Sequence, residues 1–179
     1  MVLGDVVWNI RNFKPDVIIT RFPPDARAGH GHHAASAILA REAFDAAADP
    51  KKFPEQLKNG IKPWQAKRIV WNTFNFGGTN TTAGDQLKID VGTYNAILGN
   101  SYGEIAAISL TNHKGQGFGS ALQRGESFEF FSATAGTTAK NSLFDDIELS
   151  IKDQSVSNLI TAIQKSYSVN HPAGILDKL

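Results

Sequence analysis

The sequence has no cysteine among its 179 residues, and it lacks both a strong charge imbalance and a long apolar run. The missing cysteines exclude disulfides, thiolate metal ligands and a cysteine nucleophile. A formal net charge of +1 gives no bulk attraction to nucleic acid or to an anionic membrane. No apolar stretch approaches the roughly 20 residues that a membrane-spanning helix needs, and the N-terminus does not resemble a signal peptide. We therefore expect no nucleic-acid partner and no membrane span.

What is present is an ordinary globular composition, with 41% hydrophobic and 20% charged residues. The apolar pattern predicts a helix over residues 3–12, a continuous β-branched strand at Val17–Thr20 and an alanine-rich helix over residues 33–47. A short apolar run of this kind is typical of a strand buried on both faces in a parallel sheet. Helix, strand, loop and helix in this order are typical of an open α/β fold.

The middle of the chain predicts a strand at residues 68–74 and an edge strand at residues 87–91, separated by a polar loop. Ser101 followed by Glu104 predicts a capping box. The helix that this box opens is expected to run to about His113, with Ile105 and Ile108 facing inward.

The last part of the chain predicts less regular structure. Residues 132–140 are rich in threonine, alanine and glycine, as in a linker. From Ser155 a final helix is expected, with an apolar face made by Val156, Leu159, Ile160 and Ile163. We therefore expect one domain over residues 1–130 and a linker with a C-terminal helix over residues 131–179.

Three of the five histidines lie within four residues, at His30, His32 and His33. They precede the helix expected at residues 33–47 and follow the strand Val17–Thr20, a position where α/β folds carry their sites. Neutral imidazole is a common zinc ligand, and spacing of i, i+3 puts His30 and His33 on one side of a helix start. The spacing alone fits two interpretations equally well, a metal site and a solvent-exposed loop that is rich in histidine.

The segment around these histidines, Arg21–Ala35, resembles the second conserved block of the PIG-L/LmbE-like zinc deacetylases. In that family, a His-Xaa-Asp-His or His-Gly-His-His pattern directly precedes a helix. Residues 14–20 resemble the strand before that block, and residues 99–107 and 113–119 resemble a later block. The matches follow the family's order across roughly residues 3–125.

The resemblance implies a Rossmann-like, open, mostly parallel sheet flanked by helices, with a C-terminal helical extension. It also implies a zinc-dependent N-deacetylase that acts on N-acetylglucosamine-type amino-sugar conjugates. In such a site His33 is a zinc ligand, and His30 is the catalytic histidine that faces the substrate. The resemblance also implies that Asp25, Arg27 and His32 bind the substrate.

One family block is absent: no His-Pro-Asp-Asp sequence occurs in the chain. In the family this block supplies two zinc ligands and the general base. We therefore expect the chain to lack the family's first strand, to have an incomplete Zn²⁺ site and to be weak or inactive alone. Two other interpretations stay open, a non-catalytic α/β binding or self-association module and a metal hydrolase whose ligands come from two copies of the chain.

Overall fold

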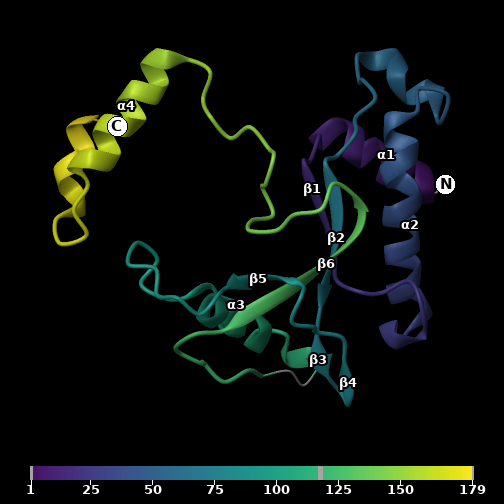
Figure 1. Cartoon of the computed structure of the whole chain (residues 1–179), viewed down its shortest axis with the longest axis horizontal. Coiled ribbons are helices and arrows are strands. Elements are labelled where there is room, and N and C mark those ends of the chain that lie inside the picture. The colour runs from purple at the N-terminus through teal and green to yellow at the C-terminus, as the bar shows by residue number, and fades with distance from the viewer. Residues whose placement is uncertain (1, 117–118, 179) are drawn as a thin grey trace. The chain divides into compact units, whose positions relative to one another are not determined.

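The computed structural model describes residues 2–116 and 119–178, and it divides into two compact units (Figure 1). The first unit contains the chain up to Asp90 together with Phe128–Ile147, and the second contains Val91–Ser127 and the chain from Glu148 onward. The first unit holds the four-stranded sheet and the histidine cluster.

The sheet of the first unit is mixed. Only one of its three strand pairings is parallel, that of the first two strands, and the other two pairings are antiparallel. The strands lie in the order β1 (Val17–Thr20), β2 (Arg68–Thr73), β6 (Phe128–Gly136) and β5 (Leu87–Asp90). An α/β protein with a sheet flanked by helices is confirmed, but the expected mostly parallel sheet is wrong.

The segment that changes the sheet is β6, which lies between β2 and β5. The composition predicted a linker at residues 132–140, but residues 132–136 form the second half of β6. The prediction of a linker is therefore wrong for residues 132–136. Strand formation depends on neighbouring strands more than on composition, and here Phe131 packs with Val70 and Leu87. Gly136 fits its place only as glycine, because φ is 78° and a Cβ would lie 2.3 Å from a backbone oxygen.

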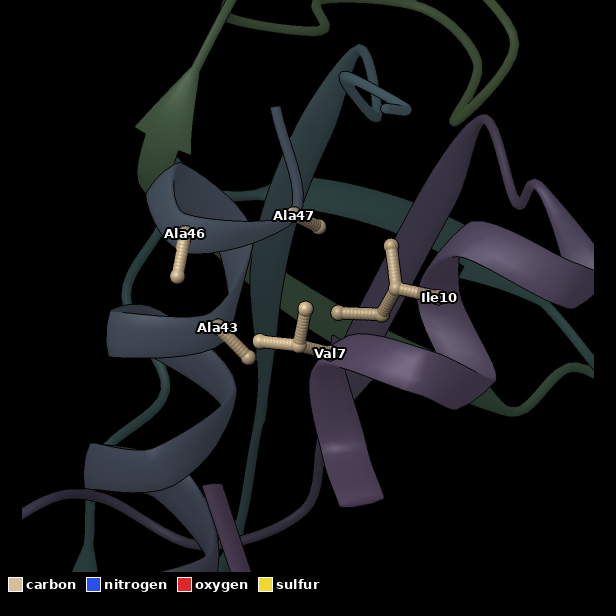
Figure 2. Close-up of a cluster of buried hydrophobic side chains, with 5 residues drawn as sticks. All are labelled: Val7, Ile10, Ala43, Ala46 and Ala47. Atoms are coloured by element: carbon tan, nitrogen blue, oxygen red, sulfur yellow. The ribbon is translucent and has the colours of Figure 1, made fainter. Parts of the chain in front are cut away.

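Two helices cover one face of this sheet, α1 (Val2–Phe13) and α2 (Gly31–Ala48). Val7 and Ile10 of α1 point toward three buried alanines of α2, Ala43, Ala46 and Ala47 (Figure 2). Ile18 of β1 packs against this cluster, so the helices lie on the face that bears Ile18. The parallel strands β1 and β2 are connected through α2, which is the crossover that parallel pairing requires.

Arg11 joins α1 to the C-terminal end of α2. Its side chain is fully buried, and it donates hydrogen bonds to the carbonyls of Ala46, Ala47 and Asp49. The last carbonyls of a helix have no partner within the helix. Arg11 therefore supplies donors where α2 ends.

The helices and strands expected before residue 91 are confirmed, with one correction. β1 is a partly buried edge strand that pairs only with β2 among the described strands, and Ile19, on the face opposite the helices, is 51% exposed. The loop after β2 contains a small hairpin of β3 (Asn75–Phe76) and β4 (Thr79–Asn80). Short 3-10 helices occur at η1 (Ala26–Ala28) and η2 (Pro54–Asn59).

The second unit contains α3 (Tyr102–Thr111), and the capping box expected at its start is confirmed. Ser101 Oγ accepts from the Glu104 amide at 3.1 Å, and Glu104 Oε2 accepts from the Ser101 amide at 2.9 Å. The inward orientation expected for Ile105 and Ile108 is wrong, since they are 38% and 48% exposed. The cap draws the Glu104 side chain inward. The buried residues of α3 are therefore Glu104 and Ala107, which lies nearly one turn later.

The remaining helices of this unit are η3 (Lys114–Gln116), α4 (Gln154–Ser166) and η4 (Pro172–Lys178). α4 confirms the expected C-terminal helix, and Asp153 caps it by accepting from the Ser155 and Val156 amides. None of its side chains is buried. Across the described residues, no helix combines the length and the apolar character that crossing a bilayer demands.

Candidate functional site

The histidine cluster lies where the chain turns from β1 into α2. Asp25 caps η1, because its carboxylate accepts the Arg27 amide at 3.0 Å. Gly29 ends η1 at a φ of 78°, a conformation that glycine adopts without strain. His30 then takes an extended conformation as the N-cap of α2. These local turns place the histidines at the carboxyl end of β1.

The structure brings the three imidazoles together. Ring centroids are 5.6 Å apart for His30 and His32, 5.2 Å for His30 and His33, and 4.2 Å for His32 and His33. His30 and His32 are exposed, whereas His33 is partly buried. The cluster is thus a compact group with one anchored member.

His33 is anchored by two neighbours. Its ring stacks on Phe22, with centroids 3.8 Å apart and planes only 2° apart. Its Nδ1 lies 3.1 Å from the carbonyl oxygen of Ala28. Because a carbonyl oxygen only accepts, Nδ1 donates, and Nε2 of the neutral ring keeps its lone pair. Metal-binding histidines use the same arrangement to fix their tautomer and orientation.

The complete ligand set for a metal is not gathered in this loop. Over residues 2–116 and 119–178, no group of three or more His, Cys, Asp or Glu side chains is arranged to hold a metal ion. The Asp25 carboxylate is already bound by Arg27. The remaining metal donors of this loop are therefore the three imidazoles.

Asp25 and Arg27 form a two-point ion pair. Arg27 Nε lies 2.9 Å from Oδ1, and Nη2 lies 2.6 Å from Oδ2. These hydrogen bonds, followed by the one from the Arg27 amide, lower the pKa of Asp25 to about 2. The Asp25 carboxylate in turn raises the pKa of Arg27. The guanidinium also lies 5.2 Å from the centroid of the Trp71 ring, so the pair fixes the loop above β2.

This pairing restricts what Arg27 can bind. A substrate must compete with Asp25 for the Arg27 donors, or use those that Asp25 leaves free. In the described part of the chain, no hydrogen bond or ion pair connects Asp25 or Arg27 to an imidazole ring. The two candidate substrate contacts and the histidine cluster are therefore neighbouring but separate groups.

A second polar group, which the sequence did not reveal, lies at the ends of β1 and β2. Arg21 Nη1 donates to Asn72 Oδ1, and Asn72 Nδ2 donates to Glu129 Oε2 at 2.7 Å. The parallel register could have predicted the contact between Arg21 and Asn72. Thr20 pairs with Trp71, so the residues that follow them, Arg21 and Asn72, lie side by side. Glu129 gave no signal because it belongs to β6, the strand that composition concealed.

His113 lies at the C-terminal end of α3 in the second unit. It is exposed, and its Nδ1 lies 3.3 Å from the Ser109 carbonyl one turn earlier. This is the contact expected of a histidine favoured at a helix C-terminus. Residues 117–118 of the matching segment 113–119 lie outside the described residues.

No model of a known protein family matches the sequence, and no curated protein matches it. The resemblance of residues 14–35 to a deacetylase block therefore stays a prediction.

Proposed function

We propose that this chain carries part of a zinc-dependent N-deacetylase site for N-acetylglucosamine-type amino-sugar conjugates, with weak or no activity by itself. The observation that supports the proposal is the contact of His33 Nδ1 with the Ala28 carbonyl, which favours Nε2 as the metal donor, beside two other imidazoles. The parallel pair β1 and β2, connected through α2, is the part of the sheet that fits a Rossmann-like arrangement. When bound, zinc supplies polarisation of the amide carbonyl and a water of lowered pKa.

The residues have distinct roles in this proposal. His33 would hold the metal through Nε2, and His30, at the N-cap of α2, would donate a proton to the departing amine. The N-terminal end of α2 carries partial positive charge, which favours the negative charge that develops on the carbonyl oxygen. His32, Asp25 and Arg27 contact the sugar hydroxyls.

Weak activity follows from the missing base. The loop's own carboxylate, Asp25, has a pKa of about 2 and holds a salt bridge, so it accepts a proton poorly near neutral pH. The His-Pro-Asp-Asp block that supplies the base in the resembling family does not occur in the sequence. Substrate binding and residual metal binding are therefore expected without efficient turnover.

The proposal is tested by measuring whether the variant His33→Phe still binds zinc. Phenylalanine keeps an aromatic ring that can stack on Phe22, but it has no metal donor. His171→Ala is the matched control, because His171 is an exposed histidine of the second unit. We expect bound zinc, measured by metal analysis and by a zinc-dependent rise in unfolding temperature, in the parent and in the control but not in His33→Phe. Equal zinc content in all three proteins, or none in the parent, would overturn the assignment.

A second function is favoured by the position of β1. This strand lies at the edge of the sheet, pairs only with β2 among the described strands, and bears the half-exposed Ile19. An uncovered edge strand is a template for pairing with another chain. The corresponding proposal is a non-catalytic module that self-associates through β1.

Sedimentation of Ile19→Lys tests self-association, because a lysine on an edge strand opposes pairing. Val169→Lys, at an exposed site of the second unit, is the control. We expect the parent and the control to form dimers and Ile19→Lys to stay monomeric. A monomeric parent at every concentration tested would remove this second function.

A further inference from the structure

A cleft of about 430 Å³ opens in the first unit beside the carboxyl ends of β1 and β2. Two of its phenylalanines are exposed, Phe76 at 76% and Phe128 at 41%. Exposed apolar residues beside a cleft mark a contact site, and this end of a parallel strand pair is where α/β folds bind ligands. The aromatic side chains of the cleft are Phe74, Phe76, Phe128 and Phe130.

Arg21 is the cationic residue among those that line this cleft, and a hydrogen bond and a ring contact orient it. Its Nη1 donates to Asn72 Oδ1, and its guanidinium lies 5.8 Å from the centroid of Phe74. Asn72 is itself held, since its Nδ2 donates to Glu129 Oε2 at 2.7 Å and to the Phe130 carbonyl at 3.2 Å. A guanidinium that is already positioned loses little conformational freedom when a ligand binds.

Part of this guanidinium is available to a ligand. Among the described residues, Arg21 forms hydrogen bonds only through Nη1, and its side chain is 55% exposed. Glu129 Oε2 lies 4.0 Å from Nη1, too far for a hydrogen bond. The Nε and Nη2 edge presents two parallel N–H donors, which is the geometry that a carboxylate accepts.

We propose that this cleft binds a small aromatic carboxylate. The carboxylate accepts two hydrogen bonds from the Nε and Nη2 edge of Arg21, and the ring packs among the phenylalanines. Glu129 limits the negative charge that the cleft tolerates, and this favours a singly charged carboxylate over a phosphate dianion. No histidine lines the cleft, so the proposal is independent of the zinc site.

Titration of the ¹⁵N-labelled full chain with benzoate tests the ligand class. We expect saturable shifts at the Arg21 side chain and at the amides of the four phenylalanines. Benzamide keeps the ring without the charge, and acetate keeps the charge without the ring. Each should bind about tenfold more weakly than benzoate, because each lacks one of the two interactions.

Two variants test the residues. Arg21→Lys keeps the positive charge but loses the paired donors, and we expect about tenfold weaker benzoate binding. Phe76→Ala removes an exposed ring that the fold does not need, and should weaken binding severalfold. Arg41→Lys is the control, because Arg41 is a half-exposed arginine of the same unit that lies outside the cleft.

The control should bind benzoate as the parent does. The proposal is overturned if the parent gives no saturable response to benzoate, if benzamide binds equally well, or if Arg21→Lys keeps the parent's affinity.

Discussion

Replacing Arg11 by methionine tests whether one buried side chain holds α1 against the end of α2. The five N–H groups of the Arg11 guanidinium lie within hydrogen-bond distance of six acceptors, five of them main-chain carbonyls, at 2.8 to 3.2 Å. Burial lowers the pKa of Arg11, while the carboxylates of Asp49 and Glu55 raise it. Arginine does not lose its proton in folded proteins, so the group stays a charged donor.

The expected cost follows from the acceptors that methionine leaves behind. Methionine fills much of the space of the arginine stem but donates nothing. The carbonyls of Ala46 and Ala47 are bonded to Arg11 in buried positions, and each unsatisfied buried acceptor costs about 1–3 kcal/mol. The other four acceptors are partly buried and can turn to water. We expect Arg11→Met to lower the free energy of unfolding by about 3–5 kcal/mol.

Urea unfolding followed by tryptophan fluorescence measures this loss. All three tryptophans, Trp8, Trp64 and Trp71, lie in the first unit, so the signal reports on that unit alone. The control is Arg41→Met, which removes an exposed i, i+4 ion pair worth about 0.3–0.5 kcal/mol. If Arg11→Met costs no more than Arg41→Met, the hydrogen bonds of Arg11 do not hold the two helices together.

Three further predictions concern local features. Because the Arg27 pair lowers the pKa of Asp25 from 3.8 to about 2, its stabilising effect is present above pH 3.8 and disappears as the pH falls toward 2. The difference in unfolding temperature between the parent and Asp25→Asn should shrink over that range, and a constant difference contradicts the pairing. Gly136→Ala should lower the free energy of unfolding of the first unit, measured in urea, by about 3 kcal/mol or more. Gly29→Ala, which has a similar φ but open space around its Cβ, should cost about 1–2 kcal/mol. Equal losses would refute the steric argument. Ser101→Ala removes the cap of α3 and should cost about 1 kcal/mol, seen as faster amide exchange in that helix alone.

Local signals in the sequence were enough for most elements. The apolar pattern of residues 3–12, the β-branched run Val17–Thr20 and the capping box at Ser101 each predicted a structure that is confirmed. They succeeded because helix periodicity, β-branching and capping act within a few residues. The prediction that Ile105 and Ile108 face inward on α3 was wrong for the opposite reason. Which side of a helix is buried depends on the elements that pack against it.

The order of the sheet was beyond local reasoning. β6 was hidden because Ser132–Gly136 has the composition of a linker, and only pairing with β2 on one side and β5 on the other makes it a strand. The second polar group was lost with it, because Glu129 reaches Asn72 only through that pairing. The mostly parallel sheet was implied by the family resemblance, and the two antiparallel pairings of β6 correct it.

The sequence by itself determined the histidine cluster, because His30, His32 and His33 are neighbours in the chain and a helix start brings their rings together whatever the rest of the fold does. Only the tertiary structure decided the stacking of His33 on Phe22 and the position of Arg21. The anchors of His33 and Arg21 are Phe22 and Asn72, and Asn72 comes from another strand. Contacts between distant segments depend on packing, and no local pattern in the chain encodes them.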